Sequence, residues 1–179
     1  MSSTPRIPSA SQAFANRIDR FIAATGRGAA WLCLFVVVVQ FAVVVLRYVF
    51  GLGSARLSES IVYAHAGLFM LAAAWTLQAG GHVRVDLFYA DASPRTRALV
   101  DLCGSLLLLL PFMAVLAWFA VPYVARSWSI LESSRETSGL PAVFLLKTLI
   151  PVFALLMALQ GVSQAIKAGV ALRGANASR

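Results

Sequence analysis

The side chains that could carry out chemistry are few in this sequence of 179 residues. It has two histidines, His65 inside a long apolar run and His82 directly after that run. On one helix they would lie at different depths, whereas a haem or zinc site needs several ligands at one place. We therefore expect no catalytic residue, no cofactor and no metal site. We interpret His65 as a hydrogen-bonded interior residue between helices.

The acidic residues lie away from the centres of the apolar runs. They are Asp19, Glu59, Asp86, Asp91, Asp101, Glu132 and Glu136. A transporter that couples to protons or cations usually carries an acid near the middle of the membrane. The chain therefore provides no obvious ion pathway of its own. The two cysteines, Cys33 and Cys103, form no CxxC pair, and we expect them to be small buried apolar residues.

Four long apolar runs must position these side chains. Residues 28–46, 60–81, 102–125 and 148–166 contain no Asp, Glu, Lys or Arg. A bilayer core of about 30 Å is crossed by about 20 apolar residues of helix, so each run is long enough to span it. The chain is therefore predicted to be an all-α membrane protein with four transmembrane helices, in spans of about 28–48, 60–80, 102–125 and 142–166.

The distribution of positive charge predicts the orientation. Ten of the 15 Lys and Arg residues lie in the first tail (1–27), the middle loop and the last tail (167–179), and five lie in the other two connections. Under the positive-inside rule both termini and the middle loop are cytoplasmic. The net charge of +8 then indicates contact with anionic membrane lipids rather than nucleic acid, because no basic run is interleaved with stacking aromatics.

Local signals place the ends of the helices. Ser58 is expected to cap the second helix, with Glu59 in its first turn, where a carboxylate complements the helix dipole. Ser93 and Pro94 predict a cap and a helix-starting proline for the third helix. Lys147, early in the fourth helix, is expected to extend towards the headgroups.

Two further signals concern the spans themselves. The second span is expected to leave the membrane at Gly80-Gly81, and Pro111 inside the third span permits a kink.

The polar leader before the first span has a helical pattern of its own. Phe14, Ile18, Phe21 and Ile22 recur at helical spacing, whereas the polar residues among them lie mostly off that stripe: Asn16, Arg17, Asp19 and Arg20. The pattern fits an amphipathic helix lying in the cytoplasmic membrane interface. It fits equally a simple extension of the first span.

The spans offer surfaces for helix packing. In the fourth, Ala154, Ala158, Gly161 and Ala165 form a strip of small residues on one face, which lets helices approach closely. Packing within this chain and binding of a partner subunit are both consistent with it. Gln40, Gln78 and Gln160 are candidates for hydrogen bonds between helices.

Several motifs, each weak alone, together resemble a known family. They are Arg47-Tyr48-Val49-Phe50-Gly51, Glu59, Gly81-His82-Val83-Arg84-Val85-Asp86, the run from Glu132 to Pro141, Lys147, Pro151 and Gln160-Gly161. In this order and spacing, over roughly residues 47–161, they resemble the small membrane subunit of tripartite ATP-independent periplasmic (TRAP) transporters, the DctQ-like subunit. That family often opens its second span with two acids or a Trp, whereas this chain has the single acid Glu59.

The resemblance implies a role in a bacterial inner membrane. In that family a large multi-span subunit carries the substrate, commonly an organic acid, together with Na⁺. A soluble periplasmic protein captures and delivers the substrate, and the small subunit packs against the scaffold of the large one. Candidate contacts with the large subunit are Arg47, Glu59, Gly81, His82, Arg84, Asp86, Lys147, Ala154, Ala158, Gly161 and Ala165.

The connection between the third and fourth spans is the candidate docking site for the periplasmic protein. Glu132, Arg135 and Glu136 are its charged residues, and a plain solvated loop is the competing interpretation. Two other functions stay open from the sequence. One is a stand-alone four-helix membrane redox protein, and the other is a small exporter that works without partners.

Overall fold

The structure is a computed structural model, which describes residues 10–82 and 92–177. Its helices are α1 (Ala10–Phe50), α2 (Ala55–Gln78), α3 (Pro94–Cys103), the π-helical segment η1 (Gly104–Leu109), α4 (Leu110–Ser129) and α5 (Val143–Ala177). Because α3, η1 and α4 follow one another without a break, they form one rod, Pro94–Ser129. Within the two described ranges, four helical rods are thus long and apolar enough to cross a membrane, which confirms the predicted fold class.

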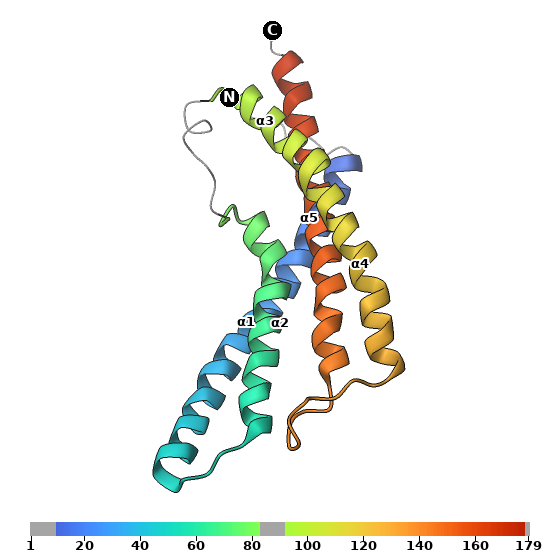
Figure 1. Ribbon diagram of the computed structural model, residues 1–179. Helices are drawn as coiled ribbons and strands as arrows, with labels where there is room; N and C mark the ends of the chain where they lie inside the picture. Colours follow the sequence, from blue (N-terminus) through green and yellow to red (C-terminus); the bar gives the residue numbers. More distant parts are fainter. Residues whose placement is uncertain (1–9, 83–91, 178–179) are drawn as a thin grey trace.

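The rods alternate in direction, so that α1 begins and α5 ends at the same end of the molecule (Figure 1). We call this the terminal end. The opposite end carries the short α1–α2 connection and the longer α4–α5 loop, residues 130–142, and we call it the hairpin end.

The polar leader is part of α1, which runs unbroken for 41 residues. Residues 10–27 are thus an extension of the first span, and their inner face packs on the bundle. Ile22 is 1% exposed and Ile18 is 8% exposed, while Phe14 and Phe21 are each more than half exposed. The stripe predicted from the sequence is therefore divided between the interior and the outer surface.

Helix α5 is the centre of the bundle. It contacts α1, α2, α3, η1 and α4, and the α1–α2 hairpin lies on one side of it with the α3–η1–α4 rod on the other (Figure 1). Among the described residues no Cα atom of α2 lies within 8 Å of a Cα atom of α4. A helix with neighbours on so many sides must be apolar around most of its circumference, as the sequence of α5 is.

The π-helical segment lies directly before Pro111. Proline has no backbone N–H to donate to the carbonyl four residues earlier, and its ring crowds that carbonyl. The wider π turn at Gly104–Leu109 accommodates this, and the N–H of Leu110 donates to Ser105 O, five residues back. The proline predicted to permit a kink therefore causes a local widening of the third span.

The start of α2 differs from the prediction. Ser54, not Ser58, is its N-cap, because the Ser54 hydroxyl accepts a hydrogen bond from the N–H of Leu57. The helix therefore begins one turn earlier, and Glu59 lies beyond the first turn, where it adds little to the helix dipole. The predicted start of the third helix is confirmed, with Ser93 as N-cap and Pro94 as the first residue.

The end of α2 lies where the glycine pair indicated. The N–H of Gly81 donates to Thr76 O and the N–H of Gly80 to Leu77 O, which is a Schellman motif. Gly80 has φ = +71°, a conformation that a residue without Cβ adopts without strain.

Candidate interaction surfaces

At the hairpin end Glu59 holds the α4–α5 loop against α2. Its carboxylate accepts a hydrogen bond from the Ser134 hydroxyl and a second one, at 2.6 Å, from the N–H of Leu140. Gly139 lies so close that a Cβ there would be 2.7 Å from Glu59 Oε1. The loop thus closes around this carboxylate. Both oxygens of the Glu59 carboxylate are thus engaged by the α4–α5 loop.

A second carboxylate in the same loop is tied to the ends of α4 and α5. Glu132 Oε2 accepts hydrogen bonds from Ser127 Oγ at 2.7 Å and from Lys147 Nζ at 2.5 Å. Lys147 also lies over the ring of Tyr123, 4.3 Å from its centroid. Lys147 therefore closes the α4–α5 hairpin instead of extending freely towards the headgroups.

We expect these contacts to make the order of the α4–α5 loop depend on pH. Hydrogen bonds from Lys147 and Ser127 hold the pKa of the Glu132 carboxyl below its ordinary value of 4.5. A lowered pKa means that the stabilisation is complete above pH 4.5 and is lost as the pH falls through the folded-state value. We expect the amide protection of Val143, whose N–H donates to Glu132 O, to fall in that acidic range. Hydrogen exchange corrected for intrinsic rates measures this. In Glu132→Gln the protection of the Val143 amide should be lower than in the wild type and independent of pH. If the variant showed the same pH dependence as the wild type, the effect would not come from Glu132.

Removal of the Glu59 carboxylate should release the loop. In Glu59→Ala the N–H of Leu140 loses its acceptor. A hydrogen bond to a charged group contributes about 1.5–3 kcal/mol, so amide exchange at Leu140 should become roughly 10-fold faster or more. The matched control is Arg56→Ala, one turn earlier on α2 and exposed. Equal protection of Leu140 in both variants would argue against the loop contact.

The predicted docking residues are thus of two kinds. Arg135 and Glu136 are exposed at the tip of the loop, whereas Glu132 is engaged by Ser127 and Lys147. The loop is internally ordered, since Ser134 Oγ accepts from the N–H of Glu136 and Ser134 N donates to Leu140 O. Arg135 and Glu136 are therefore presented on a defined surface.

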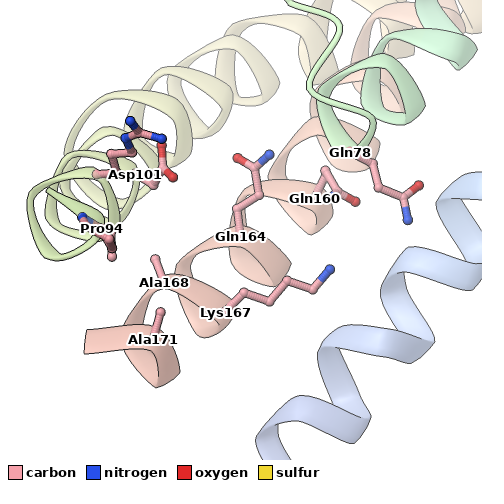
Figure 2. A pocket seen from close by; sticks show the side chains of 10 residues that line it. Gln78, Pro94, Asp101, Gln160, Gln164, Lys167, Ala168 and Ala171 are labelled. Atoms are coloured by element: carbon pink, nitrogen blue, oxygen red, sulfur yellow. The ribbon is translucent and has the colours of Figure 1, made fainter. Parts of the chain in front are cut away.

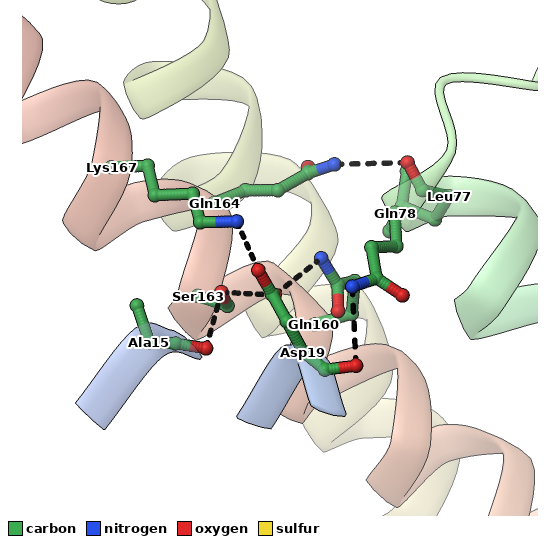
Figure 3. A network of polar contacts seen from close by, with 8 residues as sticks. All are labelled: Ala15, Asp19, Leu77, Gln78, Gln160, Ser163, Gln164 and Lys167. Carbon is green, nitrogen blue, oxygen red and sulfur yellow. Dashed lines mark hydrogen bonds and ion pairs between the residues drawn. The ribbon is translucent and has the colours of Figure 1, made fainter. Parts of the chain in front are cut away.

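At the terminal end a polar network joins α1, α2 and α5 (Figure 3). Its centre is Asp19, whose carboxylate accepts hydrogen bonds from Ser163 at 2.6 Å and Gln160 at 3.4 Å. It also forms an ion pair with Lys167. The backbone carbonyl of Asp19 accepts from Gln78 of α2 at 3.1 Å. One residue of the leader thus contacts both other helices.

Sequence reasoning missed this role of Asp19 and placed the residue off the apolar stripe. A signal was present, because Ala15, Asp19, Ile22 and Gly26 recur at helical spacing and share one face. On α5 the donors Gln160, Ser163 and Lys167 are spaced in the same way. The predicted interhelical hydrogen bonds of Gln78 and Gln160 are confirmed, while Gln40 is exposed on α1.

The strip of small residues on α5 faces the helices of this chain. Ala154 is 1% exposed, Ala165 is 9% exposed, and Ala158 packs against the core. A Cβ on Gly161 would lie 2.9 Å from Leu109 Cδ2, so α5 and η1 are in close contact there. Of the two interpretations of the strip, packing within this chain accounts for these contacts.

The carboxamide of Gln40 and the imidazole of His65, both within the apolar runs, face outwards. Gln40 on α1 and His65 on α2 are both exposed. We expected His65 to lie between helices, and within the bundle of this chain that expectation was wrong. Cys33 and Cys103 are exposed as well, contrary to their expected burial. Val37 and Val44, one turn before and one turn after Gln40 on the same face of α1, are exposed apolar residues.

The candidate contact residues that follow α2 are described only in part. Gly81 and His82 are exposed at the terminal end, and Arg84 and Asp86 lie outside the described residues. Arg47 is exposed near the last turn of α1, at the hairpin end. Among the described residues no three His, Cys, Asp or Glu side chains are grouped as a metal site would need.

Comparison with known families identifies the chain. Residues 36–169, well over half of its length, match the model of the DctQ component of tripartite ATP-independent periplasmic transporters. Neither the curated proteins nor the solved structures include a match. The matched range covers the motifs from Arg47 to Gly161 on which the resemblance rested. The chain therefore belongs to the DctQ family, and it is an inner-membrane transport component rather than an enzyme.

Proposed function

We propose that the chain is the small membrane subunit of a Na⁺-driven TRAP transporter for an organic acid, and that it packs against the scaffold of the large membrane subunit. The observation that carries the proposal is the family match over four apolar helical rods. The absence of acidic residues from the centres of the apolar runs supports it, since the substrate and ion path then belongs to a partner.

In this proposal the terminal end is cytoplasmic and the hairpin end is periplasmic. The excess of Lys and Arg in the two tails and the middle loop supports that orientation. It places the ordered α4–α5 loop where a soluble periplasmic protein can reach it.

The outer face of the α1–α2 hairpin is the proposed contact with the large subunit. Exposure of a carboxamide or imidazole to lipid is costly, and such side chains usually hydrogen-bond to another helix. Gln40 and His65 are exposed in the apolar runs of adjacent helices and would find partners there.

Copurification tests this contact. The variant Gln40→Leu/His65→Leu, expressed with the large subunit, should recover several-fold less of it, because both interhelical donors are lost. The chain itself should remain folded, since both side chains are exposed. The control is Trp118→Leu, on the exposed face of α4. Full recovery with the double variant would reject this face, and failure of the wild-type chain to bind any large membrane subunit would reject the proposed function.

The proposed docking surface for the periplasmic protein is the loop tip with Arg135 and Glu136. In Arg135→Glu/Glu136→Lys, substrate uptake by the assembled transporter should slow several-fold, with unchanged recovery of the large subunit. The control is Arg56→Glu, an exposed reversal near the other hairpin connection. Uptake equal to that of the control would argue for a plain solvated loop.

A further inference from the structure

A cavity opens at the terminal end between the end of α2, the rod that begins with α3, and α5. Its volume is about 470 Å³, which is in the range of small-molecule sites. The polar side chains on its wall are Gln78, Arg97, Asp101, Gln160, Gln164 and Lys167. Figure 2 shows Ala168 and Ala171 on α5 on the side of Pro94, and they line an apolar part of the same wall.

The cavity lies where three helices change from polar to apolar. On α3 the apolar run starts at residue 102, directly after Asp101, and on α5 it stops at residue 166, directly before Lys167. Helix α2 ends at Gln78. Such transitions mark the level of the lipid headgroups in membrane helices. The three boundary residues all line the cavity, which places it at the headgroup layer and not at the membrane centre.

The charges on the wall suit a zwitterion. Arg97 and Lys167 are cationic and Asp101 is anionic, and Asp19 pairs with Lys167 on the side towards α1. Basic pockets between transmembrane helices bind phosphate headgroups. A phosphodiester near the two cations, with an ammonium towards the carboxylate and carboxamides, would complement this arrangement.

Two carboxamides on the cavity wall indicate that the ligand carries a hydrogen-bond donor. The Nε2 groups of Gln78 and Gln160 both donate to Asp19, at 3.1 and 3.4 Å, which fixes the orientation of the two amides. Their Oε1 atoms are buried and accept no hydrogen bond within the described residues. Gln160 as a whole is 1% exposed. A buried acceptor without a partner is costly, and a primary ammonium carries three donors.

From this geometry we infer that the cavity is a binding site for one phospholipid with a primary-amine headgroup, such as phosphatidylethanolamine. The phosphodiester lies at Arg97 and Lys167, and the ammonium lies on the side of Asp101 and the glutamines. The glycerol lies along Ala168 and Ala171, and the acyl chains follow α3 and α5 into the membrane.

The first test counts the lipid that stays with the full-length chain. After extensive detergent washing, native mass spectrometry should find one phosphatidylethanolamine on the wild-type chain. Ala171→Trp places an indole in the cavity and should reduce that retention at least 10-fold. The control is Leu155→Trp, at a residue of the same helix that is 59% exposed and outside the cavity. Equal retention by Ala171→Trp and Leu155→Trp would overturn the site.

The second test needs no variant. The wild-type chain is delipidated and exposed to equal amounts of dioleoyl phosphatidylethanolamine, phosphatidylcholine and phosphatidylglycerol in mixed micelles. The choline headgroup has no N–H and the glycerol headgroup has no ammonium, so phosphatidylethanolamine should be retained several-fold more than either. Retention without this preference would overturn the assignment, as would preferential retention of phosphatidylglycerol.

Discussion

Replacement of Asp19 by Ala is expected to lower the free energy of unfolding by about 1–3 kcal/mol. The carboxylate accepts from Ser163 and Gln160 and pairs with Lys167. Gln160 is 1% exposed, so its donor cannot turn to water when the acceptor is lost, whereas the buried Ser163 hydroxyl keeps the carbonyl of Ala15, 3.3 Å away, as an acceptor. Each unsatisfied buried group costs about 1–3 kcal/mol. Lys167 is nearly half exposed, so its loss of a partner adds little.

Unfolding in mixed detergent micelles, followed by circular dichroism, measures this change. Asp19→Asn should have a smaller effect, because the amide keeps one acceptor oxygen. Glu136→Ala, which removes an exposed carboxylate from the α4–α5 loop, is the control and should be within about 0.5 kcal/mol of wild type. A stability of Asp19→Ala equal to that of Glu136→Ala would show that the network does not hold α1 against α5.

Gly26→Ala is expected to destabilise the chain by about 1–3 kcal/mol, although alanine is the better helix former. A Cβ at this residue would lie 2.5, 2.6 and 2.7 Å from Cβ, Cγ and Cδ2 of Trp75. These atoms are the stem of the Trp75 side chain and cannot swing away, so α1 and α2 must separate. Overpacking of this kind typically costs about 1–3 kcal/mol.

Gly28 supplies a matched control on the same helix. A Cβ at Gly28 meets nothing within 4 Å, so Gly28→Ala should gain roughly 0.5–1 kcal/mol through helix propensity alone. The two substitutions are chemically identical and two residues apart, yet they should shift the unfolding midpoint in opposite directions. A shift of the same sign in both would mean that α1 and α2 do not meet at Gly26 and Trp75.

Local patterns predicted the parts of the fold that depend on local physics. The four charge-free runs predicted the four rods, because the thickness of a bilayer sets the minimum length of an apolar run that spans it. Ser93 and Pro94 predicted the start of α3, and Gly80 and Gly81 the end of α2. The prediction that Ser58 caps α2 was wrong because Ser54, one turn earlier, has the same capping chemistry and caps the helix there.

Side-chain roles at the surfaces were less predictable, since they depend on which helix lies opposite. Glu59 was expected near a helix dipole, and it binds Ser134 and Leu140 from a loop far along the chain. His65 was expected inside, and it faces outwards because α5, not α2, occupies the centre of the bundle.

The amino-acid sequence by itself determined that this protein is a four-rod membrane component without an acid at the centre of any apolar run. Its family likewise followed from short motifs in a fixed order. These properties rest on composition and spacing along the chain. Only the tertiary structure decided that α5 contacts every other helix, that Asp19 joins α1 to it, and that three helix boundaries surround one cavity. Each of these requires residues distant in sequence to meet, and helix periodicity gives the face of a residue but not the neighbour which that face will contact.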